Sequence, residues 1–90
     1  MTRWVARPRV LLRRLPEGVV VLPARGHGPT SVLAGTAEEL WDLLATPHSV
    51  EELASELAAR HGADPTLVAA DLEVALDDLL GRDLVETRES

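Results

Sequence analysis

The hydrophobic pattern of the chain changes its period at Gly35, and this change limits the folds that the sequence can adopt. Before Gly35, short runs of branched and apolar residues are separated by Pro and Gly, as in strands joined by turns. After Gly35, apolar residues recur at three- and four-residue spacing behind helix-capping residues, as in amphipathic helices. A chain of 90 residues with this order is expected to form one α+β domain.

Three short strands are predicted before Gly35. Residues 9–15 and 19–22 flank the turn Pro16-Glu17-Gly18, so we expect them to form a hairpin. The second of these runs contains three consecutive valines, whose branched side chains favour a pleated strand. After a loop at residues 24–29, a third strand is predicted at residues 30–33.

Three helices are predicted after Gly35. Capping boxes at Thr36–Glu39 and Ser49–Glu52 mark the starts of the first two helices, and Asp64-Pro65 marks the start of the third. The expected helix ends are at Pro47, Gly62 and Gly81. With a short extended segment at residues 83–87, this order predicts a winged helix-turn-helix. We expect residues 1–8 to form a flexible arm, residues 9–87 the domain and residues 88–90 a tail.

Composition narrows the cellular setting and the chemistry. The chain has no cysteine, which excludes disulfides and thiolate metal sites and favours the cytoplasm. No run of about 18 apolar residues is present, and the N-terminus lacks a signal-peptide core, so we expect no membrane association. The three histidines, at positions 27, 48 and 61, have no ligand or catalytic partner at helical spacing. We therefore expect no catalytic residue, no metal site and no cofactor.

Charge is divided unevenly along the chain. Residues 1–35 contain six arginines and one acidic residue, whereas residues 36–90 contain three arginines and fourteen acidic residues. The third helix would read DNA in a winged helix, yet between Asp64 and Leu80 it carries five acids and no basic residue. Its charge has the wrong sign for phosphate, so we expect no nucleic-acid partner.

The third helix carries more apolar residues than one core face needs. At about 100° per residue, one stripe of this helix is apolar and faces the core: Val68, Leu72, Ala75, Leu76 and Leu79. A second stripe on its flank contains Leu67, Asp71, Val74 and Asp78, with Ala70 just outside it. Leu67 and Val74 either pack under other parts of the chain or form the wall of a groove for an apolar, cationic peptide.

The third strand is unusual for an edge strand. Residues Thr30, Ser31, Val32 and Leu33 include no charge and no proline, which are the usual features that stop an edge from pairing. If it lies at the edge of its sheet, it can accept a guest strand by β-augmentation. Together with the flank of the third helix, it predicts a peptide-binding groove.

The order and spacing of these apolar elements resemble the PqqD-like proteins, the stand-alone recognition elements of ribosomal peptide natural-product biosynthesis. The resemblance covers residues 9–87 and rests on a strand ending at Leu33, Thr36-Ala37-x-x-Leu40-Trp41-x-Leu43-Leu44, Ser49-Val50-Glu51-Glu52-Leu53-Ala54-x-x-Leu57, Asp71-Leu72-x-x-Ala75-Leu76-x-x-Leu79 and Leu84-Val85.

This resemblance implies a non-catalytic adaptor. Such proteins bind the leader segment of a precursor peptide, which adds antiparallel to the third strand, packs against the third helix and is presented to a processing enzyme. A discrete chain with this Arg, Ala, Leu and Val bias is similar to the leader-binding subunit of lasso-peptide systems, whose partner is a separate leader peptidase. The implied contacts are Thr30, Ser31, Val32 and Leu33 for main-chain pairing, and Leu67, Asp71, Val74 and Asp78 for the opposing wall.

Two other functions stay open at this stage. A winged-helix transcriptional regulator would contact phosphate through the Arg-rich N-terminal segment. A small dimerisation module would use Leu67 and Val74 against a second copy.

Overall fold

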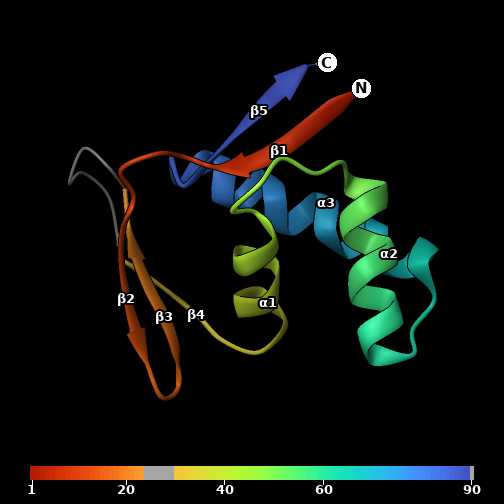
Figure 1. Cartoon of the computed structure of the whole chain (residues 1–90), viewed down its shortest axis with the longest axis horizontal. Coiled ribbons are helices and arrows are strands. Elements are labelled where there is room, and N and C mark those ends of the chain that lie inside the picture. Colours follow the sequence, from red (N-terminus) through yellow and green to blue (C-terminus); the bar gives the residue numbers. More distant parts are fainter. Residues whose placement is uncertain (24–29, 90) are drawn as a thin grey trace.

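The computed structural model describes residues 1–23 and 30–89. In chain order its elements are β1 (Thr2–Ala6), β2 (Leu11–Leu15), β3 (Gly18–Leu22), β4 (Ser31–Leu33), α1 (Thr36–Leu43), α2 (Val50–His61), α3 (Pro65–Gly81) and β5 (Val85–Glu89) (Figure 1). The α+β class predicted from the sequence is confirmed. The predicted loop at residues 24–29 and the last residue of the predicted tail lie outside the described residues.

The predicted winged helix-turn-helix layout, with all paired strands before the helices, is wrong. The five strands form two sheets: β2, β3 and β4 make an antiparallel sheet in that order, and β1 pairs with β5 after the helices. Residues 2–6, which we assigned to an arm, therefore form a strand. Its outermost pair joins Thr2 to Glu89, 87 positions apart, and a local pattern carries no information about so distant a partner.

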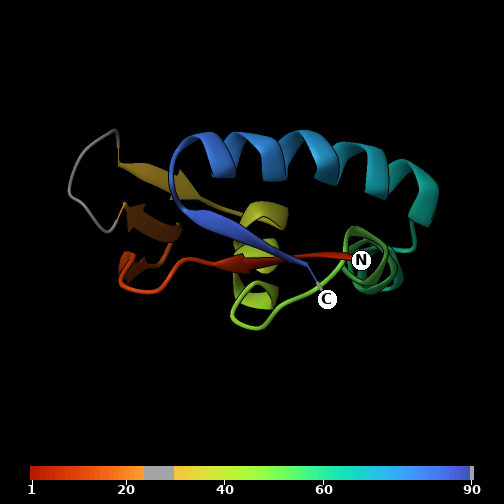
Figure 2. The ribbon, with the colours of Figure 1, turned by 90° about the horizontal axis from the view of Figure 1, so that it is seen from above.

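The core lies where the helices meet the inner faces of both sheets. Its fully buried side chains include Val19, Val21, Leu44, Leu53, Leu57, Leu76, Leu84 and Val85. Figure 2 shows α3 crossing one side of the molecule above α1, with the three-stranded sheet at one end and α2 at the other. Within residues 1–23 and 30–89, no helix combines the length and the hydropathy needed to cross a membrane.

The predicted start of α2 is confirmed in detail. The Ser49 hydroxyl accepts a hydrogen bond from the Glu52 amide at 3.2 Å, and the Glu52 carboxylate accepts one from the Ser49 amide at 2.8 Å. The predicted capping box at Thr36–Glu39 does not form, because Gly35 is the N-cap of α1 with φ of 60° and no side chain caps the helix. The Glu39 carboxylate instead lies 2.7 Å from the His61 ring on α2.

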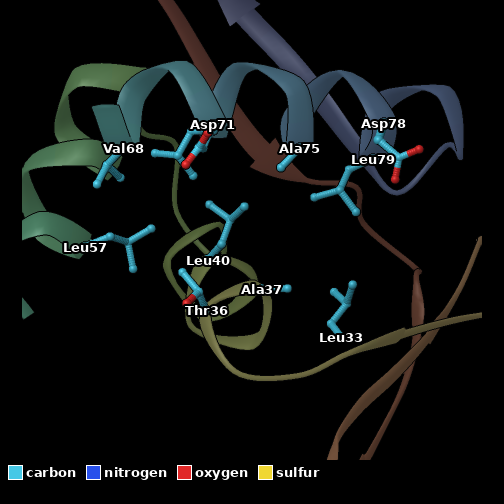
Figure 3. A pocket seen from close by; sticks show the side chains of 11 residues that line it. Leu33, Thr36, Ala37, Leu40, Leu57, Val68, Asp71, Ala75, Asp78 and Leu79 are labelled. Carbon is cyan, nitrogen blue, oxygen red and sulfur yellow. The ribbon is translucent and has the colours of Figure 1, made fainter. Parts of the chain in front are cut away.

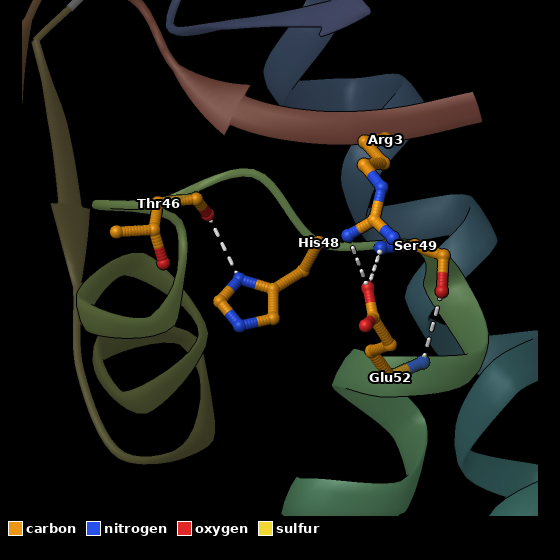
Figure 4. Close-up of polar contacts among 5 residues, drawn as sticks. All are labelled: Arg3, Thr46, His48, Ser49 and Glu52. Atoms are coloured by element: carbon orange, nitrogen blue, oxygen red, sulfur yellow. Dashed lines mark hydrogen bonds and ion pairs between the residues drawn. The ribbon is translucent and has the colours of Figure 1, made fainter. Parts of the chain in front are cut away.

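β1 is attached to the helices as well as to β5. The backbones of Trp4 and His48 exchange hydrogen bonds of 2.7 and 3.0 Å, and the Arg3 guanidinium lies 2.9 Å from the Glu52 carboxylate (Figure 4). The hydrogen bond from the Ser49 amide is the main cause that lowers the pKa of Glu52, and the charge of Arg3 adds to it. This N-terminal segment thus stabilises the start of α2.

Candidate functional site

β4 is an edge strand with an open side. It pairs antiparallel with β3 through Val19↔Leu33, Val20↔Val32 and Val21↔Ser31, and no other described strand pairs with it. The side chain of Val32 is 63% exposed, whereas that of Ser31 is buried. Figure 2 shows β4 between β3 and the C-terminal part of α3. Its unpaired backbone groups are therefore available to a further strand on the side of α3.

A groove of about 330 Å³ begins at the end of β4 and runs between α1 and α3. Apolar side chains dominate its lining, which consists of Leu33, Thr36, Ala37, Leu40, Leu57, Val68, Asp71, Leu72, Ala75, Asp78 and Leu79 (Figure 3). The small side chains of Ala37 on α1 and Ala75 on α3 both line this space (Figure 3). Because larger side chains there would fill it, these two alanines help to keep the groove open.

The two carboxylates of the groove differ in their partners. Asp78 lies 3.0 Å from Arg82 Nε, and the same guanidinium donates a hydrogen bond of 3.0 Å to the Ser31 hydroxyl on β4. Arg82 therefore connects Asp78 of α3 to β4 at this end of the groove. Asp71 has no ion pair and no side-chain hydrogen bond with any residue in the described part of the chain.

The structure brings together some of the residues that the sequence singled out. Leu33, Asp71 and Asp78 line the groove, Ser31 and Val32 form the edge beside it, and Thr30 lies exposed just before β4. Three residues lie outside the lining, on the most solvent-facing line of α3: Leu67, Ala70 and Val74. Leu67 and Val74 are 67% and 73% exposed.

Sequence reasoning missed the second wall of the groove. Ala37 and Leu40 of α1 and Leu57 of α2 line the groove, but the sequence analysis gave them no binding role. On α3, Val68 and Ala75 were assigned to the core, yet both are only partly buried and line the groove. The available signal was the presence of small residues within these apolar stripes, since an alanine leaves room that a larger side chain would fill.

The described residues include no group of three or more His, Asp or Glu side chains arranged to hold a metal ion. His48 contacts the backbone oxygen of Thr46 at 2.8 Å, and His61 contacts Glu39 on the surface. Neither histidine lines the groove. The groove is thus an apolar surface with two acids and an open strand edge, a combination that suits binding of an extended peptide.

Comparison with known families identifies the family to which this sequence is similar. The sequence model of the family described as coenzyme PQQ synthesis protein D (PqqD) matches residues 18–85, which is most of the chain. This chain belongs to the PqqD family. The predicted resemblance is therefore confirmed. The matched segment contains β3, β4 and all three helices, and hence every residue that lines the groove.

A solved structure shares the PqqD fold of this chain. It is the solution NMR structure of the PqqD truncation of Methylobacterium extorquens PqqCD, described as a functional and stand-alone recognition element for ribosomally synthesized and post-translationally modified peptides (RiPPs). The two chains are 23% identical, with a TM-score of 0.75 over 93% of this chain and 88% of that one. No curated protein matches this PqqD-family sequence.

Proposed function

We propose that this chain is a non-catalytic adaptor of RiPP biosynthesis. It binds the leader segment of a ribosomally made precursor peptide as an added strand on β4 and delivers it to a processing enzyme. In the more specific form of the proposal, the system makes a lasso peptide and the enzyme is a separate leader peptidase. Membership of the PqqD family and the RiPP recognition element that shares its fold support the general form.

The observation that carries the proposal is the position of the groove directly beside an unprotected strand edge. Main-chain pairing with β4 supplies affinity that does not depend on sequence. Side chains of the guest that point toward α3 meet an apolar lining, where burial contributes about 25 cal/mol per Å². Ordering a flexible leader costs about 2–5 kcal/mol, so both contributions are needed for stable binding.

Charge argues against a DNA-binding function for the same surface. The exposed part of α3 carries Asp71, Glu73, Asp77 and Asp78, and within the described residues Arg82 is their one ion-pair partner. A surface of this sign repels phosphate. The adaptor function is therefore favoured over a transcriptional regulator.

The test is titration of the purified chain with the leader of any short precursor peptide found to be encoded near its gene, followed by calorimetry and by amide NMR spectra. We expect a one-to-one complex in which the amides of β4 and α3 shift. The amides of β2, which is the other edge of the same sheet, should not shift. A leader of the same composition in scrambled order is the control and should not bind.

Binding that shifts β2 and leaves β4 unchanged would contradict the proposed site. A tight, salt-dependent complex with duplex DNA and none with the leader would contradict the proposed function. For the lasso-specific form, a leader peptidase should remove the leader faster when the chain is present. Leader removal by the chain alone would show that the chain is an enzyme.

A further inference from the structure

The two acids of the groove lie at different distances from the strand edge. Asp78 is close to β4, because its partner Arg82 also binds Ser31. Asp71 lies two turns of α3 earlier, on the part of the groove near Val68 and Leu57 (Figure 3). Seven residues of helix separate the two acids, which is about 10 Å at 1.5 Å per residue.

Asp71 is the groove carboxylate whose charge is not neutralised by any described residue. A peptide that fills the groove covers part of the surface around it and removes water from the carboxylate. Removing water from an unpaired charge is unfavourable unless the ligand brings an opposite charge. A peptide with a Lys or Arg at this point therefore gains affinity over one that places an apolar side chain there.

The direction of the guest strand follows from the sheet. All strand pairs of the β2-β3-β4 sheet are antiparallel, and antiparallel pairing is slightly more stable per residue than parallel pairing. A guest antiparallel to β4 begins at the Leu33 end and finishes at the Ser31 end. Its residues before the paired segment thus continue past Leu33, between α1 and α3, toward Asp71.

The distance between Asp78 and Asp71 determines how many residues separate the cation from the paired segment of the guest. An extended peptide advances about 3.3 Å per residue, so about three residues cover the distance from Asp78 to Asp71. The reach of a long cationic side chain extends this range to about five residues.

We propose that the groove selects peptides by the order of their side chains, a proposal that rests on the adaptor function above. The preferred peptide carries a Lys or Arg about three to five residues before the segment that pairs with β4, with apolar side chains between the two. Asp71 receives the cation, and the Arg82–Asp78 pair holds the other end of the groove beside the paired segment.

The first experiment compares Asp71→Asn with Asp77→Asn, measured by calorimetry with the same leader at low and high salt. Both variants remove one negative charge from α3, but Asp77 does not line the groove. We expect Asp71→Asn to weaken leader binding about three- to tenfold and to reduce its salt dependence, and Asp77→Asn to change affinity less than about twofold.

The second experiment changes the leader. In a variant leader, the Lys or Arg that precedes the paired segment is moved to the position after it, which leaves the composition and net charge of the leader unchanged. We expect the same loss of affinity as for Asp71→Asn. Replacing that cation by Glu should restore binding when it is combined with Asp71→Lys.

The outcomes separate the two proposals. If the wild-type chain does not bind the leader, the adaptor function fails. If the wild-type chain binds the leader, the adaptor function stands. The proposal that Asp71 selects a Lys or Arg before the paired segment is then overturned if the two Asn variants behave alike, or if moving the cation has no effect. A leader with no Lys or Arg before its paired segment overturns it as well.

Discussion

The sheet of β2, β3 and β4 has two free edges that differ in charge and in what lies beside them. β2 is exposed along its whole length and carries Arg13 and Arg14. Arg14 reaches from this edge to Asp42 and Glu38 on α1, at 2.6 and 3.4 Å. β4 carries no charge, and the apolar groove begins where it ends.

In the proposed function, this difference decides which of the two edges takes the leader. Both edges present backbone donors and acceptors, but charged side chains on β2 oppose the approach of another strand. In the proposed complex, the groove at β4 adds apolar contacts to the backbone pairing, so the guest strand is stabilised on two sides. The four predictions below test this contrast.

The largest effect is expected from Gly18→Ala, at the start of β3. Gly18 has φ of 154°, and a Cβ atom there would collide with the Leu33 carbonyl of β4. We expect the free energy of unfolding to fall by about 1–3 kcal/mol and leader affinity to fall at least about tenfold, because β4 is displaced. Thermal unfolding and calorimetry measure both quantities.

Gly62→Ala is the matched control for this prediction. Gly62 also has positive φ, but a Cβ atom there meets no neighbour and the residue lies between α2 and α3. It should cost about 1 kcal/mol of stability through backbone strain and leave leader affinity unchanged. Equal loss of affinity in both variants would contradict a special role for β4.

A smaller effect, confined to binding, is expected from Ala75→Phe. Ala75 lines the groove, so a phenyl ring there occupies the space of the guest side chains. We expect leader affinity to fall about tenfold, equivalent to about 1.4 kcal/mol, with little change in the unfolding temperature. Ala70→Phe places the same ring on the exposed line of α3 and should bind the leader like the wild type; equal loss in both variants would place the leader elsewhere.

Arg14→Ala should have a still smaller effect, and on stability alone. The hydrogen bond with Asp42 is the main cause that raises the pKa of Arg14, and both side chains are exposed to solvent. We expect a slight fall in the unfolding temperature that disappears at high salt. Leader affinity should stay within about twofold of the wild type. If the variant binds leader at β2 in NMR spectra, charge alone distinguishes the two edges.

The smallest effect is expected from Glu52→Gln, which lies away from both edges. Because the folded state lowers the pKa of Glu52 from 4.5, the charged carboxylate stabilises the fold above this value, and the contribution is lost as the pH falls through the lower, folded pKa. The variant should be slightly less stable than the wild type near neutral pH and equal to it in acid. Thermal unfolding across this pH range measures the difference, and leader affinity at neutral pH should not change.

Local signals predicted the elements whose ends are determined by nearby residues. The capping box at Ser49 and the left-handed Gly62 delimit α2 as expected, because each acts within one helical turn. The strand at Thr2–Ala6 was missed, since its partner lies at the other end of the chain. The capping box predicted at Thr36 does not form, because Gly35 takes the N-cap position and Glu39 binds α2 instead.

The candidate site could be predicted in part, because some of its features also depend only on nearby residues. The uncharged sequence of β4 indicated an open edge, and helical phase placed Asp71 and Asp78 on the side of α3 that lines the groove. The same phase grouped Leu67 and Val74 with them, but how far a groove extends around a helix depends on the neighbour that forms its other wall. That neighbour is α1, which contributes Ala37 and Leu40 to the lining and whose position a periodicity on α3 does not reveal.

The pairing of β1 with β5 brings the two ends of the described domain to one place (Figure 1). No residue of either strand lines the groove. A second protein can therefore be joined to the domain at either end, through a linker, without covering β4. The solved structure that shares this fold was itself obtained from a longer chain, as the PqqD truncation of PqqCD. A tether at this sheet would raise the local concentration of enzyme around a bound leader without any new contact surface.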